Sequence, residues 1–127
     1  MHRIRSKSRF SDTITLSSGA KTLTLRVDLD LTHAAQQMRK AKEALAEAQN
    51  AVMERQTDET LGVYGLALRG VIAVVFGEEQ TDSLLTFYEG RPDSMIEDIL
   101  PYVLDRVAPM MARASRKRAR MLARRRA

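Results

Sequence analysis

One stretch of the sequence, residues 61–76, is apolar on nearly every face of the helix that it would form. A helix that is apolar all round lies either in a protein core or in a membrane. A membrane span needs about 20 apolar residues, whereas this stretch is shorter and carries Arg69. It therefore predicts a buried central helix and no membrane association. Gly62, Gly65 and Gly70 each cost about 1 kcal/mol of helix propensity, so we expect neighbouring segments to press close to them.

A second helix is predicted over residues 32–55, where apolar side chains recur at alternating steps of three and four residues. Asp30 and Thr32 offer side chains that can cap its N-terminus. The narrow stripe packs either on the central helix or against a partner in a coiled coil. Its members are Leu31, Ala34, Met38, Ala41, Leu45, Ala48 and Val52. The opposite, charged face is assigned to solvent and holds Arg39, Lys40, Lys42, Glu43, Glu47 and Glu54.

A β-hairpin is predicted over residues 10–29, because apolar and polar side chains alternate on both sides of Gly19. Glycine at the first central position suits a type II′ turn. That turn would place Leu16 opposite Leu23, and Ile14 opposite Leu25, so that one face of the hairpin is apolar. A lone hairpin is marginally stable. Its apolar face must therefore lie on helices, or its free edge must pair with another chain.

Besides the helix over 32–55, helices are predicted over residues 58–76, which contain the central apolar stretch, 81–89 and 92–112. Thr57 can cap the first of them, and Gly77 and Gly90 follow the first two as C-terminal stop signals. The third begins with Pro92 in its first turn, which is a favourable position, and it also contains Pro101 and Pro109. Each of these two prolines removes a backbone donor and should kink or segment the helix.

The chain is thus predicted to be mainly α with a small N-terminal β-hairpin (α+β), with its helices packed around the buried central one. A chain of 127 residues suits a single domain. We assign residues 1–9 to a basic arm, 10–112 to the domain and 113–127 to a basic helical tail. Of the 21 Lys and Arg residues, four lie in 3–9 and eight in 113–126, which leaves nine against all 16 acidic residues in the domain.

Residue types that carry chemistry are sparse. The absence of Cys excludes disulfides and thiolate metal sites, and His2 and His33 are far apart. Asp28 and Asp30 would share a strand face, but no third ligand is spaced near them and Asp30 suits a helix cap. No nucleophile with its base, P-loop or dinucleotide loop is present. The sequence therefore predicts no enzyme, no metal site and no cofactor.

The basic tail has three interpretations, which the sequence leaves open. It is a solvated or self-neutralising tail, a contact for an acidic protein partner, or a salt-dependent and sequence-independent contact for nucleic acid. The acidic domain weakens the third interpretation, and no aromatic residue interrupts the cations to stack on bases. The cations are Arg113, Arg116, Lys117, Arg118, Arg120, Arg124, Arg125 and Arg126.

Residues 60–112 carry a familiar order of features: an apolar helix ending in Phe76-Gly77, a short segment ending in Phe87-Tyr88-Glu89-Gly90, and a helix from Asp93 towards a Lys/Arg-rich end. This order resembles the tail assembly chaperone-like proteins of long-tailed bacteriophages. The resemblance covers a little under half of the chain and rests on a pattern of apolar positions and turns.

The resemblance implies a non-enzymatic protein of the host bacterial cytoplasm that is absent from the mature virion. Its partners would be the tape measure protein and tail tube subunits, with homo-oligomers possible. A Met-rich groove would cover apolar stripes of the tape measure, since methionine repacks easily. The alternatives are a small basic nucleic-acid-binding protein and a virion component such as a head–tail connector part. The expected partner-binding residues are Met95, Ile99, Val103, Met110, Met111, Arg113, Arg116, Lys117, Arg118 and Arg120.

Overall fold

A computed structural model describes residues 9–89 and 91–126 of the chain, and the predicted arm 1–9 lies outside this range except for Arg9. The elements follow the order β1 (Arg9–Ser18), β2 (Lys21–Asp30), α1 (Leu31–Glu54), α2 (Asp58–Phe87), α3 (Pro92–Pro101), the π-helical turn η1 (Tyr102–Val107) and α4 (Ala108–Arg126). The predicted class, mainly α with an N-terminal β-hairpin, is confirmed.

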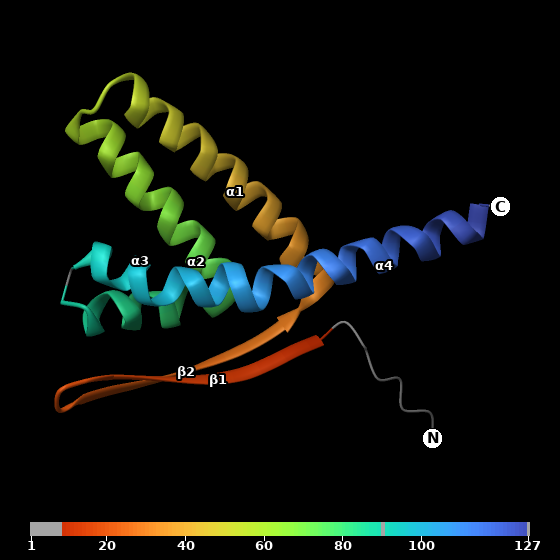
Figure 1. The fold of residues 1–127 in the computed structure, drawn as a ribbon, viewed down its shortest axis with the longest axis horizontal. Helices are drawn as coiled ribbons and strands as arrows, with labels where there is room; N and C mark the ends of the chain where they lie inside the picture. The colour runs from red at the N-terminus through yellow and green to blue at the C-terminus, as the bar shows by residue number, and fades with distance from the viewer. Residues whose placement is uncertain (1–8, 90, 127) are drawn as a thin grey trace.

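Two long helical arms extend from a common core (Figure 1). α1 and the first half of α2 form an antiparallel helical hairpin that extends to one side, and the second half of α4 extends to another. Between the arms, the second half of α2 and the continuous run α3–η1–α4 lie over the β-hairpin. The core therefore sits where these segments meet, and each arm leaves part of its surface uncovered.

The β-hairpin has the predicted register, with Leu16 opposite Leu23 and Ile14 opposite Leu25. Gly19 adopts a φ of 62°, which a type II′ turn requires at its first central position. The apolar face packs on the helices, and Leu25 and Val27 are each only 1% exposed. The outer edge of β2 is held by the side chain of Gln80.

Gln80 of α2 binds the outer edge of β2 through both polar atoms of its side chain. Its Oε1 accepts from the backbone N–H of Arg26 at 2.8 Å, and its Nε2 donates to the backbone carbonyl of Arg26 at 2.6 Å. The N–H and C=O of Arg26 therefore point away from β1. Because Arg26 is opposite Thr13, the N–H and C=O of Thr13 point away from β2 in turn, along the free edge of β1.

α1 begins as predicted and packs within the chain. The Asp30 side chain accepts from the backbone N–H groups of Thr32 and His33 at 3.1 and 3.3 Å. The predicted stripe is buried at Leu31, Ala34, Met38 and Ala48, and α1 contacts α2 along its length and α4 near its start. The stripe thus serves as an intramolecular contact, which favours the first of its two interpretations.

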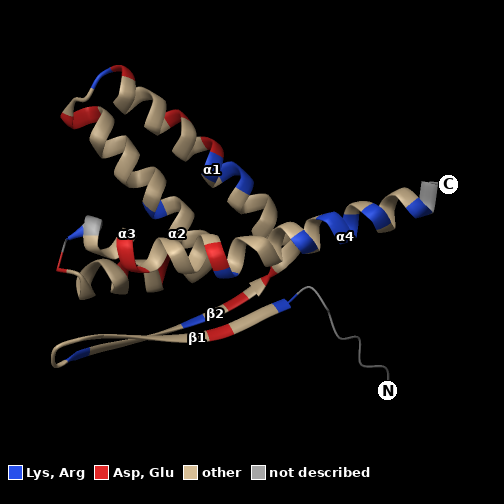
Figure 2. Cartoon of the chain, in the orientation of Figure 1, with Lys and Arg blue, Asp and Glu red and all other residues tan. Residues whose placement is uncertain are grey.

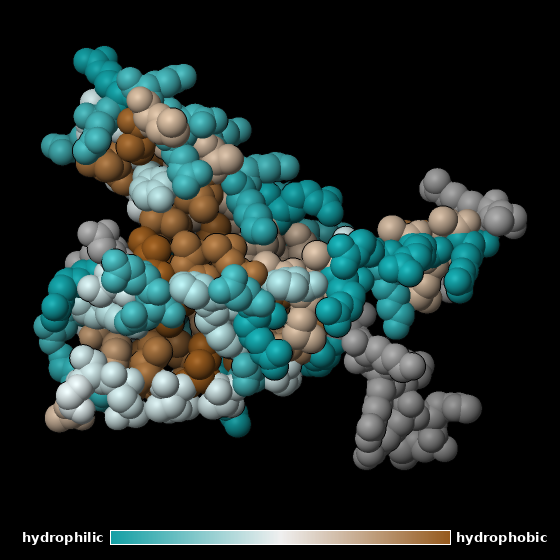
Figure 3. Space-filling model, viewed as in Figure 1, coloured by the Kyte–Doolittle hydropathy of each residue, from teal (hydrophilic) through white to brown (hydrophobic). Residues whose placement is uncertain are grey.

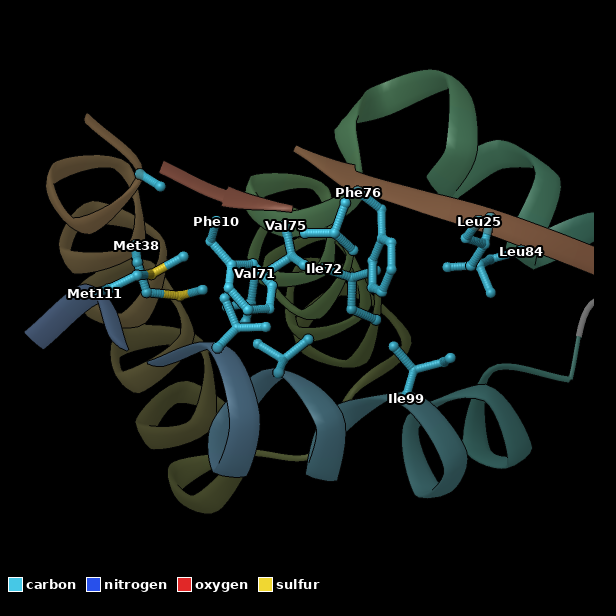
Figure 4. Close-up of a cluster of buried hydrophobic side chains, with 14 of the residues drawn as sticks. Phe10, Leu25, Met38, Val71, Ile72, Val75, Phe76, Leu84, Ile99 and Met111 are labelled. Carbon is cyan, nitrogen blue, oxygen red and sulfur yellow. The ribbon is translucent and has the colours of Figure 1, made fainter. Parts of the chain in front are cut away.

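The prediction of a central helix buried over residues 61–76 is correct for its second half and wrong for its first. Leu68, Val71, Ile72, Val75 and Phe76 are buried, in a cluster that Figure 4 shows in part. In the first half, by contrast, three large apolar side chains are open to solvent. They are Leu61, Val63 and Leu66, with exposed fractions of 42%, 52% and 69%.

The reason for this difference is that α1 alone packs on the first half of α2, whereas β2, α3 and η1 also contact the helix elsewhere. A Cβ added at Gly62, Gly65 or Gly70 would meet nothing within 4 Å. The expected close approach of neighbouring segments to these glycines is therefore wrong. Their helix-propensity cost is not offset by packing inside this chain.

Gly77 divides α2 into two helical segments, with φ of 78° and ψ of 164° inside what is otherwise a continuous helix. The second segment starts directly after it, earlier than the predicted start at residue 81. Arg69, the one charge of the apolar stretch, spans the bend through Glu78 at 3.1 Å and Asp82 at 2.5 Å. Buried Thr81 donates to the carbonyl oxygen of Gly77 at 2.7 Å.

The last helical run is continuous in Figure 1, and it is segmented near the two prolines, as predicted: α3 ends at Pro101, and α4 begins at Ala108, next to Pro109. η1 follows Pro101, and the N–H of Ala108 bonds to the carbonyl oxygen of Val103, five residues earlier. A π-helical turn of this kind absorbs a missing donor without breaking the helix. α4 then runs to Arg126 without interruption, so the predicted helical form of the tail is observed, joined directly to the domain.

The π-helical turn also explains the spacing of the core face. Its five buried residues recur every four positions, and four residues of an α-helix overshoot one turn by about 40°. A π-helical turn winds less per residue and compensates this drift. The row therefore stays on one side of the helix through Met95, Ile99, Val103, Val107 and Met111.

Candidate functional site

The predicted Met-rich groove is not open. Met95, Ile99, Val103 and Met111 are 3%, 1%, 0% and 2% exposed, and Met110 is half-buried. The first four belong to the protein's own core, against α2 and the hairpin. The prediction that Met95, Ile99 and Val103 line a groove for a partner is therefore wrong, whereas Met111 also lines a small groove between α1 and α4. An amphipathic stripe shows that a helix has a covered face, but the cover here is this chain itself.

An open apolar surface lies instead on α2. Residues four apart share one side of a helix, which places Gly62, Leu66 and Gly70 in one row, with Val63 and Ala73 beside it. We call these five residues the α2 face. Val63 and Leu66 are 52% and 69% exposed. Glu59 lies on the same side one turn before Gly62, and Arg69 borders the face and is paired with Glu78 and Asp82. Figure 3 shows hydrophobic surface along α2 between the helical hairpin and α3.

The predicted basic residues lie on α4, where it leaves the body (Figure 2). At about 100° per residue, five cations fall within an arc of roughly 100° on one side, and Arg118 lies on the other side. We call the five the α4 arc. Within residues 9–89 and 91–126, none of them forms an ion pair with the acidic domain. The members of the arc are Arg113, Arg116, Lys117, Arg120 and Arg124.

A groove of about 330 Å³ lies where α1 meets α4, and the sequence did not predict it. It joins Arg39 and Lys42, which were assigned to a solvent face, to Met111 and Arg116, which were predicted to bind a partner. The pattern that could have revealed it is the pair of cations Arg39 and Lys42 beside the stripe residue Met38. The lining consists of Ala35, Met38, Arg39, Lys42, Ala108, Met111, Ala112, Ser115 and Arg116.

A larger hollow of about 590 Å³ lies between β2, α1 and the bend of α2. Three of its polar side chains have partners in the chain. Asp28 binds Arg9 at 2.8 and 2.9 Å, Glu78 binds Arg69, and Gln80 binds the backbone of Arg26. Arg9 lowers the pKa of Asp28 by this hydrogen bond. These contacts are structural, since they join β1 to β2 and α2 to β2.

The residues that the structure describes hold no cluster of metal ligands. Over that part of the chain, no three His, Cys, Asp or Glu side chains gather where they could hold a metal ion. Asp28 and Asp30, which are close in sequence, have separate tasks as an ion-pair partner and a helix cap. The α2 face, the α4 arc and the groove between α1 and α4 are surfaces on which a partner can bind.

α2 is also the one described helix that is long and apolar enough to cross a membrane by length and composition. In its most apolar window 28% of the residues are buried within the chain. This helix thus carries both core residues and apolar surface that the chain does not cover.

Two tyrosines tie α2 and η1 to carboxylates elsewhere in the fold. Tyr88 donates to Asp98 at 2.8 Å, and Tyr102 donates to Asp12 of β1 at 2.7 Å. Burial and the hydrogen bond to the Asp98 carboxylate raise the pKa of Tyr88 to about 12. Burial and the bond to Asp12 raise the pKa of Tyr102 in the same direction.

The raised pKa of Tyr88 predicts alkaline destabilisation. The folded chain holds the phenol proton more tightly than the unfolded chain, so this contribution is complete below the ordinary pKa of 10.0 and is lost as the pH rises towards 12. We expect the free energy of unfolding to fall across this interval, and to fall less steeply in Tyr88→Phe. Urea denaturation at a series of pH values measures both slopes, and equal slopes would contradict the assignment.

Comparison with models of protein families, with curated proteins and with solved structures finds no match to this chain.

Proposed function

We propose that this chain is a non-enzymatic assembly chaperone, which covers an apolar helical segment of a partner protein until that partner is assembled. The observation that carries the proposal is the α2 face, an apolar surface on the most apolar helix, with Leu66 69% exposed. Exposed apolar surface of this kind marks interaction sites in proteins. By the resemblance of residues 60–112, the partner is the tape measure protein of a long-tailed phage, and the site of action is the host cytoplasm.

A helix is the partner element that best fits this face. Gly62 and Gly70 flank Leu66 in one row, and a Cβ at either glycine would meet nothing within 4 Å. A row of this type leaves depressions on both sides of a single projecting leucine. Another helix can lay its side chains into such depressions, because packing inserts the ridges of one helix into the grooves of the other.

A protein partner fits the surroundings of the face better than a lipid bilayer does. α1 packs along α2 and carries charged, exposed side chains on its far side, among them Lys40, Glu43 and Glu47. Insertion of α2 into hydrocarbon would take these charges with it or separate the two helices, and either change is costly. A partner helix can cover the α2 face while α1 stays in place.

The free edge of β1 gives tail tube subunits a place to dock under the same proposal. The backbone N–H and C=O groups that point outward belong to alternate residues. Thr13 and Thr15 are among them, because Arg26, opposite Thr13, directs its own N–H away from β1 to Gln80. Asp12 already accepts from the N–H of Thr13 at 2.9 Å, which blocks the edge at that point. A strand that pairs with β1 would therefore use the segment nearer the turn.

The test is recovery of the tape measure protein from cells that express it together with this chain. We expect Leu66→Arg to reduce recovery at least tenfold, because it places a charge in the centre of the α2 face. Met53→Arg is the matched control, since Met53 is 84% exposed on α1, outside the face. It should leave recovery unchanged.

Failure of the unsubstituted chain to recover any tape measure protein would refute the proposed partner. Sedimentation with phosphatidylglycerol vesicles addresses the membrane alternative. Vesicle binding that Leu66→Arg abolishes and Met53→Arg does not would assign the α2 face to lipid instead.

A nucleic-acid-binding protein is the second candidate, and the α4 arc favours it. Its cations are exposed on a helix whose second half projects from the body. Binding to a DNA duplex would weaken steeply with salt, in proportion to the phosphates neutralised. Such binding, lost in a chain that ends at Met111, would support this candidate over the chaperone.

A further inference from the structure

The groove between α1 and α4 has an apolar floor. Met38 and Met111 lie side by side beneath it, from the two helices, and are 4% and 2% exposed (Figure 4). Ala35 and Ala108 are half-buried and complete the floor. A floor of this composition accepts one apolar side chain, and the flexible methionines can adjust to its shape.

The rim of the groove, in contrast, is positively charged. Arg39 and Lys42 reach it from α1, and Arg116 reaches it from α4. No acidic residue is among the lining residues. In the part of the chain that the structure describes, none of the three cations forms an ion pair. Like charges that converge on one site repel one another, and a bound anion would reverse this effect.

The positive surface continues beyond the groove along one side of α4. The α4 arc includes Arg116 itself and extends to Arg124, eleven residues from its first member. At 1.5 Å per residue, the arc is about 16 Å long. A ligand anchored in the groove therefore meets a row of cations at the spacing of successive helical turns. Figure 2 shows these basic residues on α4 and on the adjacent part of α1.

We propose that the groove and the α4 arc form one binding site for an acidic amphipathic helix of a partner protein. One apolar side chain of that helix occupies the floor above Met38 and Met111. Its carboxylates, spaced three or four residues apart, lie against the cations of the rim and of the arc. The site lies apart from the α2 face, and the inference does not depend on the proposed function.

The two features together select this occupant over simpler anions. A free phosphate would leave the apolar floor uncovered. Nucleic acid gains from aromatic stacking platforms, and neither the groove nor the arc contains an aromatic residue. An acidic helix satisfies both features, because amphipathic helices present apolar and charged residues on adjacent sides.

The test uses a synthetic helical peptide of about 18 residues, long enough to span the arc. It carries Glu at steps of three and four residues on one side and a single leucine beside that row. Fluorescence anisotropy measures its affinity for the full chain. We expect binding that weakens with added salt and falls at least fivefold for a peptide of the same composition in scrambled order.

Substitutions in α4 separate the site from its overall charge. Arg116→Glu should weaken binding at least tenfold, and Arg116→Gln should weaken it less. Arg118→Glu carries the same charge change on the other side of the helix and should change binding less than twofold. Ala112→Phe fills the groove without a change of charge and should weaken the peptide while leaving poly-glutamate binding unaffected. All three positions are exposed, and circular dichroism checks the folding of the four variants.

Three outcomes would overturn the inference. Equal effects of Arg116→Glu and Arg118→Glu would show that the peptide is bound only by the overall positive charge of α4. Equal binding of the ordered and scrambled peptides would show that the groove does not contribute to binding. Tighter binding of a 20-bp DNA duplex than of the peptide, lost in Arg116→Glu but kept in Ala112→Phe, would assign the surface to nucleic acid.

Discussion

Replacement of Ile72 by alanine is expected to lower the free energy of unfolding by about 3–4 kcal/mol, as is usual for large-to-small changes at fully buried sites. Ile72 is 0% exposed and belongs to the core cluster that joins α2 to the β-hairpin and to the α3–η1–α4 run. Leu66 lies six residues earlier in the same apolar stretch and is 69% exposed. Leu66→Ala should therefore change stability by less than about 0.5 kcal/mol.

Guanidinium denaturation followed by the helical circular dichroism signal measures both variants. The comparison is sharp because the two residues are similar in size and chemistry and differ only in what covers them. Equal destabilisation by the two substitutions would mean that the first half of α2 is covered in solution, by a second copy of the chain or by another contact. Measurement at several protein concentrations distinguishes a second copy, since only association depends on concentration.

The β-hairpin was predictable in detail because its signals are local. Period-two alternation identifies the strands, and glycine at position 19 selects a turn that permits a single register. Once the turn is fixed, Leu16 must lie opposite Leu23, and the apolar face follows from that pairing. The caps at Asp30 and Thr57 were predictable for the same reason, since a side chain and the N–H groups that it binds lie within three residues.

The division of α2 into a covered and an uncovered half was not predictable in the same way. A helix that is apolar on all sides has no periodicity that shows which side, or which half, its neighbours reach. The position of β2 and α3 decides this, and both come from segments distant in sequence. Leu66 and Ile72 are thus similar apolar side chains in one helix, but Leu66 is exposed and Ile72 is buried.

The stripe Met95–Met111 shows a related limit. The sequence correctly indicated a covered face on this helix, but an amphipathic pattern is the same whether the cover is a partner or the chain itself. Here the four-residue spacing gave further information that had not been used. It fits a helix that contains a π-helical turn, whereas a partner groove on a regular α-helix would drift around the surface.

The groove between α1 and α4 went unpredicted because each of its walls looked ordinary. Cations beside an apolar stripe are common on solvated helices, and Arg39 and Lys42 fit that description. Only the crossing of the two helices brings them to Arg116 and gives them a shared apolar floor. A site built by convergence of two surfaces requires the tertiary structure for its recognition.

Substitution of Gly77 by alanine is expected to lower the free energy of unfolding by about 2–3 kcal/mol, within the range for residues forced into sparsely populated backbone regions. Its φ of 78° and ψ of 164° form a combination that is open to glycine and essentially closed to residues with a side chain. A Cβ at this position would meet nothing within 4 Å. The whole penalty therefore arises from the backbone conformation rather than from a clash with neighbours.

Gly70→Ala, in the same helix, is the matched comparison, and it should raise the free energy of unfolding by about 0.5–1 kcal/mol. Gly70 is helical, and its added Cβ also meets open space, so the substitution removes only the helix-propensity cost of glycine. Opposite signs for the two Gly→Ala changes, measured by the same denaturation, identify the bend at Gly77 as a feature of the folded chain. A stabilising effect of Gly77→Ala would instead indicate a straight α2 in solution. In that case the contacts of Arg69 with Glu78 and of Gln80 with β2, which the bend makes possible, would not form.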